Sequence, residues 1–156
     1  MTVSSKVFTE LQLYLWRIRF DKEEEWRPDV HLMGSDSVLK TIQDALSSMK
    51  LEFQVEGQST RKFLCNPPED VDVVRLAKEN KAEIEWQIWL IFRLEKERKE
   101  EQPFELKNKA VTVWLEENTL NQLLQVLGNQ ISNPAEYPKG QRVVAGLYLA
   151  TDWLGN

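Results

Sequence analysis

The strongest strand pattern of the chain runs through residues 82–95, AEIEWQIWLIFRLE. Every even-numbered position from Ala82 to Leu94 is apolar, and most odd-numbered positions carry charged or amide side chains. Alternation of this kind predicts a β-strand with one buried and one solvated face. Trp89 and Ile91 interrupt the solvated face with large apolar side chains, so we expect another surface to cover part of it.

A second long strand is predicted over residues 10–20, ELQLYLWRIRF. Its second half alternates, with Tyr14, Trp16, Ile18 and Phe20 on one side and Arg17 and Arg19 on the other. Its first half alternates in the opposite phase, because leucines occupy positions 11, 13 and 15. This change of phase predicts either a bulge or a strand that is covered on both faces.

Two stretches carry apolar side chains at the spacing of an amphipathic helix. The first runs to about Met49, and a side chain within 35–37 can accept a hydrogen bond from the free amides of its first turn. The second helix has Asn118 as its expected N-cap and stops at Asn133-Pro134. Its apolar stripe consists of Leu120, Leu123, Leu124, Leu127 and Ile131.

Several shorter elements follow from local patterns. Residues 51–56, LEFQVE, alternate strictly and predict a strand, for which 61–65 is a candidate hairpin partner. Short strands are also predicted at 30–33 and 111–115. The tail, 142–154, suits a strand or a helix, and we favour a strand because Gly146 weakens a helix interior.

The two halves of the chain resemble each other. An offset of 74 aligns 14–20 with 88–94, and an offset of 81 aligns Leu39, Ile42 and Leu46 with Leu120, Leu123 and Leu127. Any two stretches with the order strand–strand–helix would align in a similar way, because few positions are identical. We interpret the pattern as a duplication, in which each helix must lay its apolar stripe on a sheet.

The predicted fold class is therefore α+β. We expect an antiparallel sheet with two main helices packed on one face, built from a duplicated ββα(β) unit, with Trp16 and Trp86 beneath the helices. The chain is predicted to form a single domain over 1–156. Its pseudo-repeat halves, about 7–65 and 82–154, are joined by a linker with a short helix at 66–81.

Composition narrows the class of protein. The chain has 156 residues, of which 42% are hydrophobic and 29% charged, as in folded globular domains. A net charge of −5 argues against binding to nucleic acid or to an anionic membrane. Cys65 is the single cysteine, which excludes an internal disulfide, and no signal-peptide pattern follows Met1. We therefore expect a cytoplasmic protein without membrane spans.

No motif for catalysis or for a cofactor occurs in the sequence, so we expect neither. His31 is the single histidine and lies in a strand-like segment. A reactive thiol needs nearby positive charge, which Arg61 and Lys62 could supply to Cys65, but a small buried side chain is the more common arrangement.

Glu83 and Glu85 are the candidate metal ligands, because both project from one face of the same predicted strand. Two acids in this arrangement can hold a divalent ion that activates water. However, Gln87 stands where a nuclease would have a lysine. The more common interpretation is a solvated polar face, so no metal is expected.

These observations favour a non-catalytic protein-binding or regulatory protein over an enzyme. The predicted contact surface contains Trp89 and Ile91, and the expected partner is a protein, including a second copy in a homodimer. One alternative is a small-molecule sensor or carrier with a tryptophan-lined cleft between the halves. Another is a metal-dependent hydrolase that uses Glu83 and Glu85.

Overall fold

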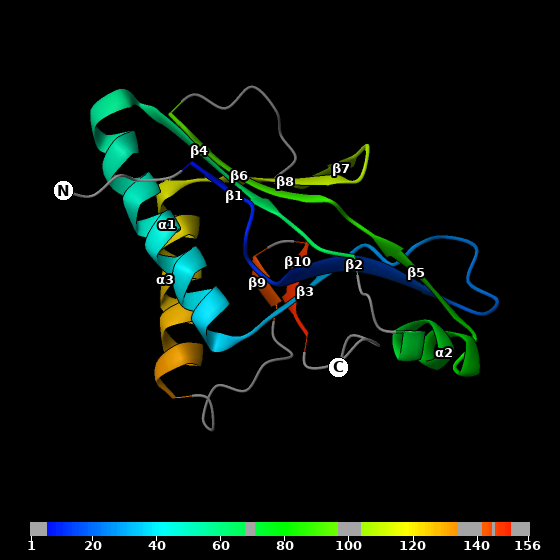
Figure 1. The fold of residues 1–156 in the computed structure, drawn as a ribbon. Helices are drawn as coiled ribbons and strands as arrows, with labels where there is room; N and C mark the ends of the chain where they lie inside the picture. The colour runs from blue at the N-terminus through cyan, green and yellow to red at the C-terminus, as the bar shows by residue number, and fades with distance from the viewer. Residues whose placement is uncertain (1–5, 68–70, 97–103, 134–141, 145, 151–156) are drawn as a thin grey trace.

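The computed structural model describes residues 6–67, 71–96, 104–133, 142–144 and 146–150 (Figure 1). Its helices are α1 (Asp36–Glu56), α2 (Val71–Glu79) and α3 (Glu117–Ser132). Its strands are β1 (Val7–Phe8), β2 (Leu13–Phe20), β3 (Val30–Gly34), β4 (Gln58–Leu64), β5 (Ala82–Trp86), β6 (Trp89–Glu95), β7 (Phe104–Lys107), β8 (Ala110–Leu115), β9 (Arg142–Val144) and β10 (Leu147–Leu149). The α+β class predicted from the sequence is confirmed.

The strands form two mixed sheets rather than the antiparallel sheet that we predicted. Sheet A has the order β1-β4-β6-β8-β7, and sheet B has the order β5-β2-β3-β10-β9. The pairs β1–β4, β6–β8 and β3–β10 are parallel, whereas the other neighbours are antiparallel. The prediction failed because alternation reveals which side chains are buried, but not the direction in which a neighbouring strand runs.

The stretch 82–95 is two strands that belong to different sheets. β5 pairs with β2 in sheet B, and β6 lies between β4 and β8 in sheet A. The Gln87 amide donates to the Leu15 carbonyl at the end of one sheet, and the Ile88 amide donates to the Lys109 carbonyl in the other. Ile88, expected on the buried face, is 45% exposed, whereas Gln87 is buried. This segment therefore joins the two sheets.

One core lies between α1, α3 and the inner faces of both sheets. α1 and α3 pack against each other on the same side of the sheets (Figure 1). The core includes Leu39, Ile42 and Leu46 from α1, Leu120, Leu123 and Leu127 from α3, and Leu13, Leu90, Phe92, Val111 and Val113 from the strands. Burial of these side chains is the main stabilising term of the fold. No helix of the described part is both long and apolar enough to cross a membrane.

The strand predicted at 51–56 is wrong, because these residues form the last turns of α1. Phe53 follows Met49 by four residues and is buried, which continues the helical stripe. Leu51 and Val55, which completed the apparent alternation, are 65% and 82% exposed. Gly57 then ends the helix with a φ of 78°, a conformation that suits glycine. β4 begins directly afterwards and pairs with β6 instead of forming a hairpin with 51–56.

Of the two predicted N-caps, the one for α1 is correct and the one for α3 is wrong. The Ser35 hydroxyl accepts a hydrogen bond from the Val38 amide at 3.3 Å, as an N-cap should. α3 begins one residue after Glu116, so the assignment of Asn118 as its cap was wrong. The strand preferred for the tail is confirmed over Arg142–Val144 and Leu147–Leu149, and Trp153 and Leu154 lie outside the described residues.

Trp16 and Trp86 do not lie beneath the main helices. They form a cross-strand pair, with ring centroids 5.7 Å apart, on the face of β2 and β5 opposite to Arg17 and Arg19. Trp86 instead lines a hollow against α2. Two neighbouring residues of β2, Leu15 and Trp16, are therefore both fully buried, because the two faces of this strand are covered by different parts of the chain.

The duplication stays a prediction. The aligned stretches are β2, β3 and α1 in the first half and β6, β8 and α3 in the second, where β7 lies between the two strands, and the core residues that the offset of 81 aligns are buried in both halves. The pairing differs, however, because β2 and β3 are antiparallel whereas β6 and β8 are parallel.

Candidate functional site

The candidate contact surface is the outer face of sheet A, the side that points away from α1 and α3. Along β6, Leu90, Phe92 and Leu94 point into the core, so Trp89, Ile91 and Arg93 must point outward. The same alternation places Leu64, Thr112 and Trp114 on this outer face. The three helices pack elsewhere: α1 and α3 on the inner side, and α2 against β5.

The strand register arranges these side chains in rows across the sheet. Trp89 lies between Leu64 and Ala110, and these three residues form an apolar row. The next row contains Lys62, Ile91 and Thr112, with Val7 beside Lys62 and Glu105 beside Thr112. The third row places Arg93 between Thr60 and Trp114. The surface thus combines two tryptophans and aliphatic side chains with charges of both signs.

The arrangement of Trp89 and Ile91 matches what the sequence predicted, since both lie on one face and are only partly buried. The sequence did not reveal Leu64 and Trp114 as their companions. The signal was present as alternation within β4 and β8, but the register that brings these strands to either side of β6 comes from the tertiary structure.

Glu83 and Glu85, the candidate metal ligands, are both paired with arginines of β2. Arg17 holds Glu85 through two hydrogen bonds, Nε to Oε1 at 2.9 Å and Nη2 to Oε2 at 3.0 Å. Arg19 Nη2 lies 2.6 Å from Glu83 Oε2. The Arg17 guanidinium lowers the pKa of Glu85 from its usual 4.5, against the opposing effect of desolvation. A metal ion would have to compete with both arginines for these carboxylates.

The Arg17–Glu85 and Arg19–Glu83 pairs form a ladder of side chains across β2 and β5. Gln87 continues this ladder into the protein. It is buried, and its amide nitrogen donates to Glu85 Oε1 at 3.1 Å and to the Glu85 carbonyl at 3.3 Å. Gln87 therefore orients the carboxylate that Arg17 binds. Within the described ranges, no three His, Cys, Asp or Glu side chains gather so that they could hold a metal ion.

Trp26 closes the ladder from the β2–β3 connection. The guanidinium carbons of Arg17 and Arg19 lie 4.8 and 4.9 Å from the centre of its ring, and the Arg27 amide donates to the Ile18 carbonyl. Cation–π contacts of this kind stabilise an arginine over an aromatic face. The charged stretch 21–27 is thus tied to β2. Sequence reasoning missed Trp26 because nothing local links it to residues seven to nine positions earlier.

His31 and Cys65, the single histidine and the single cysteine, are both buried. His31 lies between the rings of Trp16 and Tyr148, at centroid distances of 5.7 and 5.5 Å. Burial raises the pKa of the Cys65 thiol to about 12, only partly offset by a backbone hydrogen bond. The thiol is therefore protonated at neutral pH and is not poised for attack.

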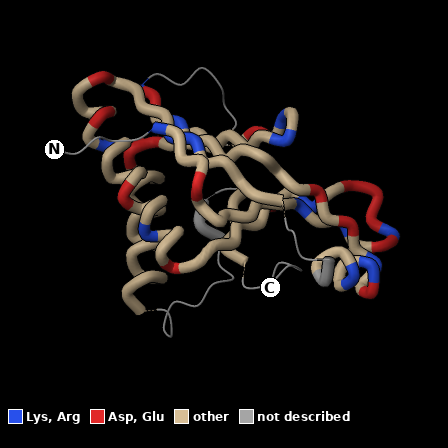
Figure 2. The backbone as a smooth tube through the Cα atoms, viewed as in Figure 1, with Lys and Arg blue, Asp and Glu red and all other residues tan. Residues whose placement is uncertain are grey.

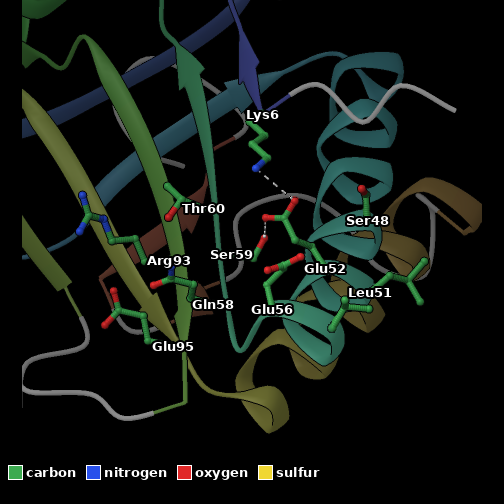
Figure 3. A pocket seen from close by; sticks show the side chains of 11 residues that line it. Lys6, Ser48, Leu51, Glu52, Glu56, Gln58, Ser59, Thr60, Arg93 and Glu95 are labelled. Carbon is green, nitrogen blue, oxygen red and sulfur yellow. Dashed lines mark hydrogen bonds and ion pairs between the residues drawn. The ribbon is translucent and has the colours of Figure 1, made fainter.

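Three hollows differ in character. The largest, about 880 Å³, lies between α1, β4 and the end of β6 and is mostly polar (Figure 3). The second, about 640 Å³, is lined by charged side chains of the β2–β3 connection and α2. The third is apolar, measures about 260 Å³ and contains Trp86. It is smaller than the usual ligand pocket of roughly 300 to 1,000 Å³, and no tryptophan lines the two larger hollows.

No protein-family model matches the chain, and no curated protein is similar to it in sequence.

Proposed function

We propose that the chain is a non-catalytic protein-binding protein that pairs with a second copy of itself through the outer face of sheet A. The observation that carries this proposal is the position of Trp89 and Ile91. They lie beside Leu64 on the face of the sheet opposite to α1 and α3. Tryptophan at the centre of such a face is typical of binding hot spots.

The charges around the apolar row support a second copy as the partner. Lys62 and Arg93 lie on the same face as Glu95 and Glu105, so the surface has both signs within a few strands. In a twofold dimer each residue of one surface meets a different residue of the same surface on the other copy. A face with both signs can therefore complement itself, whereas a face of one sign would repel its copy.

The chemistry of the singled-out residues supports binding over catalysis. Glu83 and Glu85 are each held by an arginine, and the Cys65 thiol is buried with a raised pKa. Trp89 and Ile91, in contrast, are partly buried on the outer face and are not members of the core cluster. The protein thus presents its distinctive side chains on a surface rather than around a reaction centre.

The proposal is tested by measuring the mass of the chain in solution. We expect the wild type to sediment as a dimer at about 100 µM, a concentration at which weak dimers with ordinary interfaces associate. Ile91→Glu and the double variant Trp89→Glu/Ile91→Glu should sediment as monomers, because each buries a charge in the interface. Val55→Glu is the matched control, since Val55 is an exposed aliphatic residue on α1.

Circular dichroism spectra of the variants must match the wild type for the comparison to count. A wild type that stays monomeric, or an Ile91→Glu variant that stays dimeric, would show that this face is not the contact between copies.

A further inference from the structure

One edge of sheet A is only partly covered. β4 pairs with β6 along its whole length on one side, but on the other side β1 pairs only with Lys62 and Phe63. The Lys62 amide donates to the Lys6 carbonyl at 2.9 Å, so the even-numbered residues of β4 direct their backbone groups to this edge. Gln58 and Thr60 share that direction, and no strand of the described ranges lies beside them.

The polar hollow of about 880 Å³ lies directly against this open stretch. Figure 3 shows it between α1, which contributes Glu52 and Glu56, and the beginning of β4, which contributes Gln58 and Thr60. Two exposed apolar residues of α1, Leu51 and Val55, also line it. A helix facing an unpaired strand across a groove is an arrangement that accepts an extended peptide as an additional strand.

A buried arginine makes the strand side of this groove rigid. Arg61 is 0% exposed, and its Nη1 donates to Glu52 Oε1 at 3.2 Å, to Ser59 Oγ at 3.0 Å and to the Thr60 carbonyl at 2.9 Å. Its Nη2 donates to Ser48 Oγ at 3.2 Å. Burial of this charge is tolerated because it is paired and hydrogen-bonded. The edge of β4 is thereby fixed relative to α1 before any partner arrives.

Lys6 of the chain itself is an example of a basic residue beside the edge of β4. The Lys6 carbonyl accepts the β4 hydrogen bond, and the Lys6 ammonium lies 3.4 Å from Glu52 Oε2. A lysine next to β4 thus sends its side chain to the acidic side of α1. Further along the groove, Glu56 is exposed, and Figure 2 shows acidic residues at this end of α1. The net charge of −5 also favours a basic partner.

We propose that the groove between α1 and β4 binds an extended, lysine- or arginine-containing segment of another protein. The segment lies along Gln58–Thr60 as an additional strand, bonded to the Gln58 and Thr60 amides and the Gln58 carbonyl at that edge, and places a basic side chain on Glu56. The groove shares Thr60, Arg93 and Glu95 with one end of the outer face, but Trp89 and Ile91 do not line it, so the segment would be a second partner.

The test measures binding of a fluorescein-labelled hexapeptide of alternating lysine and valine, acetylated and amidated at its ends, by fluorescence anisotropy. We expect the full chain to bind it, and a version with a methyl group on every backbone amide to bind at least about tenfold more weakly. That peptide has the same charge but cannot pair as a strand. Replacing its lysines with glutamate should abolish binding.

Two variants of the protein locate the site. Glu56→Gln should weaken binding roughly threefold, as expected for one partly exposed charge pair. Glu24→Gln, which removes the same charge from the β2–β3 connection, should leave it unchanged. Thr60→Pro removes a donor from the open edge without breaking a bond to β6, and should weaken binding at least about tenfold.

Three results would overturn the proposal. The first is an absence of binding by the full chain, and the second is equal affinity for the N-methylated peptide, which would indicate charge attraction alone. The third is binding that appears only after deletion of residues 1–5, because the groove would then serve the chain's own N-terminal segment. The peptide comparison remains decisive if Thr60→Pro fails to fold.

Discussion

Gly57 illustrates how one residue determines the boundary between two elements. It ends α1 in a left-handed conformation, and its amide donates to the Phe53 carbonyl at 2.8 Å. The chain then reverses into β4, which places Ser59 and Arg61 against Glu52 of the same helix. Both the hydrogen-bond network around Arg61 and the groove beside it depend on this reversal.

We expect Gly57→Ala to lower the free energy of unfolding by about 1 kcal/mol, because a Cβ raises the energy of the left-handed conformation. No atom lies within 4 Å of the position that this Cβ would occupy, so the cost is conformational and not steric. Gly57→Asn should cost less, since asparagine tolerates this conformation better. Urea unfolding curves measure both, and equal losses would contradict the explanation.

At the level of elements, α1 shows both the strength and the limit of pattern reading. Its stripe through Leu39, Ile42 and Leu46 to Met49 was predicted correctly because those side chains recur at helical spacing. Its last turns were mistaken for a strand, because Leu51 and Val55 are exposed apolar residues that imitate alternation around Phe53. The burial of these side chains distinguishes a helix from a strand over 51–56. That burial depends on which parts of the chain pack against the helix.

Two leucines of α1 provide a direct check of whether residues 51–56 belong to the helix. Leu46 is 0% exposed within the core, and Leu51 is 65% exposed on the same helix. Leu46→Ala should lower the free energy of unfolding by about 2 to 5 kcal/mol, through lost burial and the cavity that remains. Leu51→Ala should change it by less than about 0.5 kcal/mol, as is usual at the surface. A large loss at Leu51 would argue for the strand that the pattern first suggested.

For the molecule as a whole, the ladder of Arg17, Arg19, Glu83 and Glu85 holds sheet B to the β2–β3 connection. Each arginine lies more than sixty positions from its glutamate in the sequence, and the two meet because β2 and β5 pair in register. Trp26 covers both arginines, so the connection is tied to the sheet by the same side chains. The stability of this region should therefore depend on the charge of Glu85.

The pH dependence of stability follows from the lowered pKa of Glu85. A carboxylate whose pKa is lower in the folded state stabilises that state above its usual pKa of 4.5, and the stabilisation disappears as the pH falls through the folded value. We expect wild type to exceed Glu85→Gln in free energy of unfolding at neutral pH, and the difference to shrink at about pH 3.

Urea unfolding at both pH values measures this difference, with Glu24→Gln as a control at an exposed carboxylate of the β2–β3 connection. A Glu85→Gln deficit that stays constant with pH would assign the effect to lost hydrogen bonds rather than to charge.

The amino-acid pattern alone determined the α+β class, the cores of α1 and α3, the strands around 30–34 and 110–115, and the outward position of Trp89 and Ile91. These features depend on the spacing of apolar side chains along one segment, which a sequence displays directly. The two mixed sheets, the break at Gln87, the arginine partners of Glu83 and Glu85, and the open edge of β4 were decided by tertiary packing. They depend on register and direction between distant segments, because a strand's own side chains do not encode which neighbour its backbone groups will bond.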